Sequence, residues 1–390
     1  MKKKIMYISD YSLEQYNSVR DILYNIIEQL GHHEYEHIIV CSNSSLLYPL
    51  KVSEKCGIKT YFTLKQSFRS LLCSRELSAI QKVGYIFKHI LVNFIMSICS
   101  RIGHCYQKAS CLSLYSKIFK KEKPDLVIYF SFSPKKGFSK ICAKRKIPYI
   151  SILYDTFIER PNISKNAALI ENDEIVNAVG YFVPDFFMEG YLKHYSHANI
   201  HSYFLPLLIP KENVISALEN SKRTYKFSYF GQMQSFRNSD GIKEIFKELG
   251  LSLEIFSAEK KVSDEVYIYH DAVSDEKLHK VVAESDFLVA FDNGEPYTHY
   301  LPSKAYLYVS FTKPIIVFGN NKHSALKDFL SQYPMYYYHN TDEDSLEGLI
   351  SFINKKHPNK FDEEIYSVYK DYLPQNALKG IVALIENTIN

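Results

Sequence analysis

The sequence contains no tryptophan and no CxxC pair. Its 32 tyrosines and 25 phenylalanines supply the aromatic side chains, a balance that we interpret as compositional bias and not as a binding feature. The seven cysteines are odd in number and confined to the first 142 residues. These properties argue against a disulfide framework and against a zinc site, and they favour a reducing compartment.

Long apolar segments and a glycine-rich nucleotide loop are also missing. The basic start, MKKKIMYISDYSLEQY, has no apolar core of about 7–15 residues, so we expect no signal peptide. Two lysines, a histidine and an asparagine interrupt residues 79–99, whereas a membrane-spanning helix needs about 20 mainly apolar residues. This segment is either a buried helix, which we favour, or an interfacial helix at lipid headgroups. Because no GxGxxG follows the first apolar strand, the pattern argues against a dinucleotide-binding domain.

The net charge of +4 hides an asymmetry along the chain. Residues 1–205 contain 27 Lys and Arg against 17 Asp and Glu, a net charge of +10, whereas the remainder contains 20 against 26, a net charge of −6. Basic residues cluster at 2–4, 117–123 and 144–146. They predict an anionic partner, unless they are lysines solvated at helix ends. No nucleic-acid motif or interleaved base-stacking pattern accompanies them, so a membrane surface is favoured over nucleic acid.

A chain of 390 residues is too long for one ordinary domain, and two domains are the default. Short apolar strands alternate with amphipathic helices, which predicts an α/β fold with parallel sheets covered on both faces. Prolines and polar residues at 206–224 indicate a linker. We therefore expect an N-terminal domain at 1–205, a C-terminal domain at 225–372, and a helix at 373–390 that could pack back on the N-terminal domain.

The segment LPSKAYLYVSFTKPIIVFGN at 301–320 is a candidate anion site. Pro302 is tolerated in the first turn of a helix, because its missing N–H would be unpaired there. Ser303 and Lys304 would then lie where free N–H groups and the positive end of the helix dipole gather. The segment therefore either holds a phosphate or diphosphate, or it is an ordinary loop–helix–strand unit with a solvated lysine.

A carboxylate follows the expected strand at 147–153 in the N-terminal half. Asp155 would lie at the carboxyl end of that strand, where it could act as a general base or orient an acceptor hydroxyl. A helix cap or a turn residue is the alternative.

Three segments, in this order, carry a resemblance: FSYFGQMQSFRN at 227–238, SDEKLHKVVAESDFLVAF at 274–291 and LPSKAYLYVSFTKPIIVFG at 301–319. They resemble GT-B glycosyltransferases, specifically the large bacterial group that uses nucleotide-sugar donors. The N-terminal half agrees only in its alternation and in beginning with a strand. The resemblance implies two Rossmann-like domains facing a cleft, with the donor nucleotide on the C-terminal domain and the acceptor on the N-terminal domain.

The resemblance also implies roles for individual residues. Gly231 would let the backbone approach the donor closely. Arg237 and Lys304, with N–H groups at Ser303, would stabilise the leaving nucleoside diphosphate without a metal. Asp155 loosely matches an acidic or histidine-containing strand end in the family, which would make it a base or an acceptor ligand.

This sequence departs from the family pattern at two carboxylates. Such families carry a ribose-binding glutamate three residues after the lysine, where Leu307 stands here, and a partner glutamate at the position of His299. Leucine cannot accept a hydrogen bond, so ribose contacts must come from elsewhere. Asp292 and Glu295 are the nearby carboxylates that could take the place of this glutamate. Thr312 stands where the family has a glycine.

A different glycosyltransferase class binds a divalent metal through an Asp-x-Asp motif. Residues 342–344 match the letters but open an expected helix, so we interpret them as helix N-terminal charges. We assign no metal and no cofactor, with the nucleotide-sugar acting as substrate.

The leading hypothesis is a cytoplasmic, metal-independent glycosyltransferase of the hexosyl type. It would transfer a sugar to a lipid-linked surface glycan, such as lipopolysaccharide or capsule. The basic half motivates peripheral attachment to the anionic inner face of the membrane. A nucleotide-sugar epimerase of the same fold and a catalytically inactive GT-B partner subunit remain alternatives, the second supported by Leu307.

Overall fold

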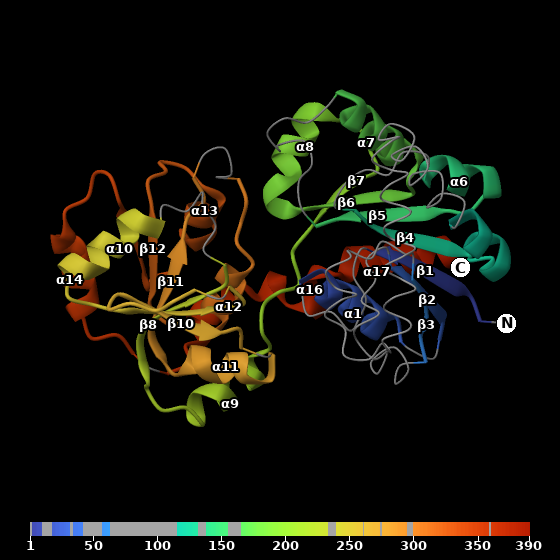
Figure 1. The fold of residues 1–390 in the computed structure, drawn as a ribbon. Coiled ribbons are helices and arrows are strands. Elements are labelled where there is room, and N and C mark those ends of the chain that lie inside the picture. Colours follow the sequence, from blue (N-terminus) through green and yellow to red (C-terminus); the bar gives the residue numbers. More distant parts are fainter. Residues whose placement is uncertain are drawn as a thin grey trace, which may run out of the picture. The chain divides into compact units, whose positions relative to one another are not determined.

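The computed structural model describes residues 2–9, 18–31, 34–41, 57–62, 115–131, 138–154, 165–232, 239–259, 261–273, 275–294, 299–358 and 360–390. The chain forms two compact units (Figure 1). Unit 1 comprises Met1–Tyr203 and Leu378–Asn390, and unit 2 comprises Phe204–Ala377. Each contains one parallel sheet flanked by helices, which confirms the α/β fold class. Residues 79–99, for which two interpretations were open, lie outside the described residues.

The sheet of unit 1 has the strand order β3-β2-β1-β4-β5-β6-β7, and every described pair is parallel. Its strands are continuous apolar runs because helices cover both faces. The strands are β1 (Lys4–Ser9), β2 (Glu36–Cys41), β3 (Lys59–Phe62), β4 (Leu126–Ser131), β5 (Tyr149–Leu153), β6 (Gly180–Pro184) and β7 (Ile200–Tyr203).

Helices α1 and α17 pack together on one face of this sheet, and α6 and α7 pack together on the other (Figure 1). The helices of unit 1 include α1 (Ser18–Leu30), α6 (Phe138–Arg145), α7 (Lys165–Asn177), α8 (Met188–His194) and α17 (Lys379–Ile389), with a 3₁₀ turn η1 (Asp185–Phe187). Helix α1 buries the apolar face expected from its spacing and ends before Gly31. The last helix, α17, buries Ile381, Ile385 and Ile389 in this unit.

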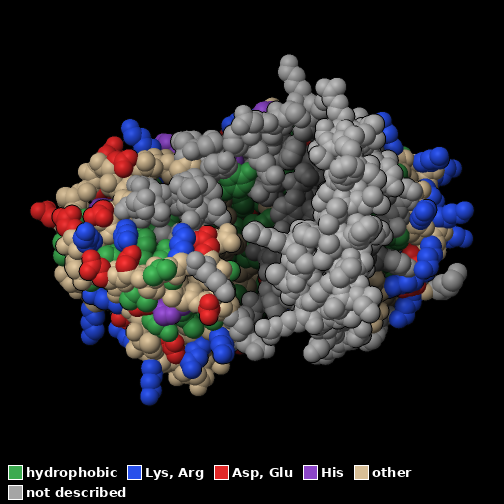
Figure 2. Space-filling model, in the orientation of Figure 1, with side chains coloured by type: hydrophobic (Ala, Val, Ile, Leu, Met, Phe, Trp, Pro, Cys, Tyr) green, Lys and Arg blue, Asp and Glu red, His purple; other side chains and the backbone are tan. Residues whose placement is uncertain are grey.

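The three basic clusters meet at one edge of the unit 1 sheet. Residues 2–4 begin β1, while 117–123 and 144–146 precede β4 and β5, so in a parallel sheet all three lie at the amino-terminal edge. The Asp125 carboxylate contacts the first cluster twice, accepting the backbone N–H of Lys4 at 2.8 Å and pairing with Lys3 at 3.7 Å. Lysine and arginine side chains gather on the side of this unit that carries the N-terminus (Figure 2).

The sheet of unit 2 has the order β10-β9-β8-β11-β12-β13, again parallel. One apolar cluster, with side chains from α9, α11, α12, α13 and α15, covers one face, and a second, with α10 and α14, covers the other. The strands are β8 (Tyr225–Phe230), β9 (Leu253–Ser257), β10 (Tyr267–Asp271), β11 (Ser285–Phe291), β12 (Ile315–Gly319) and β13 (Tyr336–Asn340). The helices are α9 (Lys211–Glu219), α10 (Ser239–Glu248), α11 (Asp275–Ala283), α12 (Lys304–Ser310), α13 (Ala325–Leu330), α14 (Leu346–Asn354), α15 (Glu363–Ser367), η3 (Lys370–Tyr372) and α16 (Pro374–Ala377).

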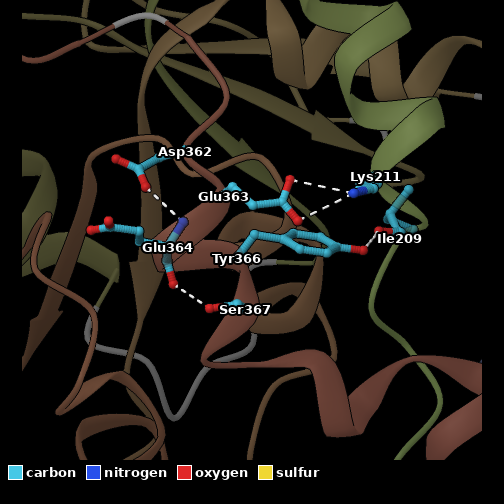
Figure 3. A network of polar contacts seen from close by, with 7 residues as sticks. All are labelled: Ile209, Lys211, Asp362, Glu363, Glu364, Tyr366 and Ser367. Carbon is cyan, nitrogen blue, oxygen red and sulfur yellow. Dashed lines mark hydrogen bonds and ion pairs between the residues drawn. The ribbon is translucent and has the colours of Figure 1, made fainter.

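Residues 206–224, expected to be a linker, contain helix α9 and belong to unit 2. Val214 of α9 is completely buried in the apolar cluster of that unit. Polar contacts fix the start of α9 to α15: the Tyr366 hydroxyl donates to the Ile209 carbonyl at 2.7 Å, and Lys211 pairs with Glu363 at 3.2 Å (Figure 3). The segment after β7 is therefore packed against unit 2 along its length.

Within the described residues, no helix combines the length and apolarity that crossing a bilayer requires.

Candidate functional site

Two loops meet at the centre of the unit 2 sheet. Strand β8 pairs with β9 on one side and with β11 on the other, so the strand order reverses between β8 and β11. Open α/β sheets bind ligands at the carboxyl ends of the strands at such a reversal. The loop after β8 begins with Gly231, and the loop after β11 runs from Asp292 toward Pro302 and α12.

Lys304 begins α12 and places its ammonium at this reversal point. The Lys304 Nζ donates to the Tyr229 hydroxyl at 2.7 Å and lies 3.9 Å from the centroid of the Tyr229 ring. Tyr229, completely buried in β8, donates its own hydroxyl proton to the carbonyl of Gln232 at 2.7 Å. A full positive charge is therefore held next to the loop that follows β8, where an anion could reach it.

Gly231 leaves room for that ammonium. Its φ of +124° is a conformation that residues with a side chain rarely adopt. A Cβ atom at this position would lie 3.0 Å from Lys304 Nζ. The backbone N–H of Gly231 donates to the Phe256 carbonyl at 2.9 Å, which fixes the turn against β9. The backbone conformation therefore favours glycine here, and a side chain would also displace the lysine.

Ser303 precedes α12 with an exposed side chain that makes no capping hydrogen bond. The first turn is closed by the Ala305 N–H, which donates to the Pro302 carbonyl at 2.9 Å, and by the Tyr306 N–H, which donates to the Ser303 carbonyl at 3.3 Å. Because α12 has only seven residues, we assign the charge of the site chiefly to the Lys304 ammonium and not to the helix dipole.

Asp292 is 3% exposed, and protein groups surround its carboxylate. One oxygen accepts the Asn293 backbone N–H at 2.9 Å. The other accepts the Asn321 amide and the Tyr338 hydroxyl, both at 3.1 Å. Burial, followed by the charge of Asp292, raises the pKa of Tyr338. These contacts favour a role for Asp292 in fixing the start of the loop.

Two asparagines hold the same loop, and the sequence reasoning did not identify them. The Asn293 side-chain amide donates to the Tyr300 carbonyl at 3.0 Å, and the Asn321 amide donates to the Asn293 carbonyl at 2.7 Å. The position of Asn321 could have been predicted, because it follows β12 and the carboxyl ends of paired parallel strands lie at the same edge of a sheet.

The two positions that depart from the family pattern have different surroundings. Leu307 packs, partly buried, against the apolar cluster of unit 2. It therefore contributes to the core and has no polar atom to offer a ligand. The His299 ring lies 4.2 Å from the Tyr300 ring, and burial lowers the pKa of this histidine, which favours its neutral form.

Three of the candidate residues, Asp155, Arg237 and Glu295, lie outside the described residues. The structure therefore brings together Gly231 and Lys304, with Ser303 adjacent in the chain and Asp292 at the start of the neighbouring loop. Among the residues that the structure describes, no group of three or more His, Cys, Asp or Glu side chains could hold a metal ion. Metal independence remains a prediction.

Solved structures superpose over nearly the whole of this chain. A glycosyltransferase from Rickettsia africae ESF-5 superposes with a TM-score of 0.55 at 12% identity, over 100% of this chain and 94% of that one. HepE from Anabaena, solved with UDP, superposes with a TM-score of 0.54 at 8% identity, over 100% and 97%. The chain has the GT-B fold.

The GT-B fold also occurs in a second class of protein. A putative UDP-N-acetylglucosamine 2-epimerase from Listeria monocytogenes superposes with a TM-score of 0.51 at 11% identity, over 99% of this chain and 96% of that one. No family model matches the sequence, and no curated protein matches it. The fold alone therefore does not separate the two activities, and the site must be used to do so.

Proposed function

We propose that this chain is a glycosyltransferase that uses a nucleotide-sugar donor. The supporting observation is the Lys304 ammonium, held beside Gly231 where the strand order of the second sheet reverses. A leaving nucleoside diphosphate gains negative charge in the transition state, and a fixed cation stabilises that charge. Arg237, six residues after Gly231 in the sequence, would add a second cation that can bind two phosphate oxygens at once.

The other candidate residues complete the donor site. Ser303 would contact the diphosphate beside Lys304, and Glu295 would accept hydrogen bonds from the ribose hydroxyls in place of the missing glutamate at Leu307. Asp292 would act by holding the loop that carries Glu295. Asp155, after β5 of unit 1, would be the base or the acceptor ligand. In this proposal the reaction transfers a hexose and needs no metal.

Replacing Lys304 tests the assignment of the donor site. Lys304→Met keeps the length and apolar stem of the side chain but removes its charge. We expect donor turnover to fall about 100-fold or more, because one fixed donor to a developing anion contributes roughly that factor. Lys247→Met, which removes an exposed lysine on α10 of the same unit, is the control. Unchanged turnover in Lys304→Met would place the donor elsewhere.

We further propose that the acceptor is a lipid-linked surface glycan and that the protein attaches to the inner face of the membrane. The support is the convergence of three basic clusters on one edge of unit 1. Helix ends with solvated lysines are the alternative explanation, since helices in a parallel sheet end at this edge. A flotation assay with anionic liposomes at low and high salt decides between them, because only a membrane-binding edge gives salt-sensitive flotation.

The epimerase hypothesis keeps the donor site and removes the acceptor. The likeness to the Listeria structure supports it, whereas Leu307 supports the inactive partner subunit. Incubation with a nucleotide-sugar and no acceptor separates the two activities, since only an epimerase produces an isomerised sugar. If no nucleoside diphosphate binds in calorimetry, the chain is an inactive partner subunit.

A further inference from the structure

Tyr229 contacts both parts of the candidate donor site, although the sequence pattern gave it no role. We propose that Tyr229 is a positioning residue that holds the Lys304 ammonium against the loop after β8. This inference rests on the proposed function for the identity of the ligand, a nucleoside diphosphate. Its geometric basis is independent of that function.

The direction of both hydrogen bonds follows from the chemistry of the groups. A protonated lysine can only donate, so the Tyr229 oxygen accepts from Lys304 Nζ at 2.7 Å. A backbone carbonyl can only accept, so the single hydroxyl proton of Tyr229 points to Gln232, also at 2.7 Å. The two bonds do not compete, and together they fix the hydroxyl in one orientation.

The aromatic ring is itself immobilised. Tyr229 is completely buried in β8, and its ring lies 4.5 Å from the ring of Phe291 on the neighbouring strand β11. The Lys304 ammonium lies over the face of the Tyr229 ring, at 3.9 Å from its centroid. The ring thus offers the cation a favourable electrostatic surface, and the hydroxyl sets its direction.

The consequence for binding is preorganisation. A free lysine side chain loses rotamer freedom when it contacts a ligand, which weakens binding. Here Tyr229 has already ordered that side chain, and the same hydroxyl donates to the carbonyl of Gln232, five positions before Arg237 in the sequence. Loss of the hydroxyl should therefore weaken diphosphate binding, even though Tyr229 itself need not contact the ligand.

The test uses Tyr229→Phe, which retains the buried ring and removes both hydrogen bonds. Tyr333→Phe is the matched control, because Tyr333 is also buried in unit 2 and donates its hydroxyl to a backbone carbonyl, that of Lys313, at 2.7 Å. UDP, GDP, CDP and dTDP are titrated into the full-length protein by calorimetry, and the tightest binder is carried forward. We expect Kd to rise about tenfold in Tyr229→Phe and to stay within about twofold in Tyr333→Phe.

A second readout needs no ligand. An acetylating reagent modifies accessible lysine amines, and mass spectrometry gives the rate at Lys304. We expect this rate to rise severalfold in Tyr229→Phe but not in Tyr333→Phe, because the amine is no longer held.

The two readouts distinguish the possible failures. An unchanged labelling rate in Tyr229→Phe overturns the inference, whatever the ligand. Faster labelling with an unchanged Kd overturns the positioning role. If no nucleoside diphosphate binds the wild-type protein, the proposed function fails, while the labelling rate still decides whether Tyr229 holds Lys304.

Discussion

At the scale of single residues, the absence of a side chain at Gly231 leaves space for the Lys304 ammonium. Gly231→Ala would place a methyl group 3.0 Å from Lys304 Nζ and force a side chain to adopt a φ of +124°. We expect nucleoside diphosphate affinity to fall at least tenfold, because the ammonium must move off its site. Calorimetry measures the loss.

Gly250→Ala is the matched control for this substitution. Gly250 also has a positive φ, +63°, but a Cβ atom there meets nothing within 4 Å. Both variants should lose roughly 1 kcal/mol or more of stability from backbone strain. Only Gly231→Ala should lose affinity, and an equal loss in Gly250→Ala would mean that general destabilisation is the cause.

Lys313, unlike Lys304, is a buried lysine with a structural role. It is 2% exposed, and its Nζ donates to the carbonyls of Ala283 at 2.8 Å and Ser285 at 2.6 Å. These carbonyls lie at the end of α11 and the start of β11, so the side chain caps the helix and joins it to the sheet. Burial lowers the pKa of Lys313 to about 8, with the nearby Asp286 opposing the shift.

The lowered pKa of Lys313 predicts a pH dependence of stability. Its pKa is about 8 in the folded protein and about 10.4 when unfolded, so between these values the unfolded chain binds more protons. Stability from this group therefore rises with pH across that window, by about 1 kcal/mol from pH 7 to pH 9. Urea unfolding of the wild type and of Lys313→Met at both pH values tests this. The free energy of unfolding of the wild type, relative to that of the variant, should be larger at pH 9 than at pH 7. A constant difference would contradict it.

At the scale of elements, the contacts between the start of α9 and α15 differ in their energetic weight (Figure 3). The Lys211–Glu363 pair is 46% and 63% exposed, and such pairs contribute about 0–1 kcal/mol. The Tyr366 hydroxyl instead donates to the Ile209 carbonyl from a buried side chain, and burial raises the pKa of Tyr366 to about 12.

We therefore expect Tyr366→Phe to destabilise unit 2 by about 1 kcal/mol or more, because it leaves a shielded carbonyl without its donor. Lys211→Met should change stability by less than about 0.5 kcal/mol. Urea unfolding compares the two variants. A larger loss in Lys211→Met would show that the ion pair, and not the hydrogen bond, fixes this segment.

Elements that form from local pattern could be predicted from the sequence. The strand expected at 147–153 corresponds to β5, because buried parallel strands are continuous apolar runs. Lys304 could be predicted at the start of its helix, since Pro302 marks the first turn. The prolines and charges of segment 206–224 predicted a linker and gave no sign of α9, whose Val214 is buried.

Features that depend on distant partners could not be predicted in this way. Tyr229 looks like any aromatic residue of a core strand, and its role depends on Lys304, which lies 75 positions later. Helix α7 has a mostly polar sequence. Its Glu171 is nevertheless completely buried, accepting hydroxyl protons from tyrosines in later segments, Tyr181, Tyr191 and Tyr195. Such hydrogen bonds between residues distant in the sequence can be identified only once the folded structure is known.

At the scale of the whole molecule, unit 1 is assembled from both ends of the chain. Leu378, Ile381, Ile385 and Ile389 are at most 5% exposed in this unit. Burying each such side chain contributes roughly 1.5–3 kcal/mol, and the sum is comparable to the whole stability of a typical domain.

We therefore expect a fragment of residues 1–203 not to unfold cooperatively in urea, whereas residues 204–377 alone should do so. Adding a peptide of residues 378–390 to the first fragment should restore the transition. Circular dichroism at increasing urea concentration measures both fragments. A sharp transition of residues 1–203 alone would show that α17 is dispensable.

The hydrogen bond from the Leu208 N–H to the Tyr372 carbonyl, 3.2 Å long, has a consequence for how such a chain can be rearranged. This bond brings the two ends of unit 2 close together. Unit 2 is inserted into the sequence of unit 1 and does not follow it as a separate consecutive domain. A single cut between the units cannot release either of them, since a second crossing still joins them. Because its ends are close together, another domain of the same fold could be inserted in place of residues 204–377. Helix α17 would then still complete unit 1.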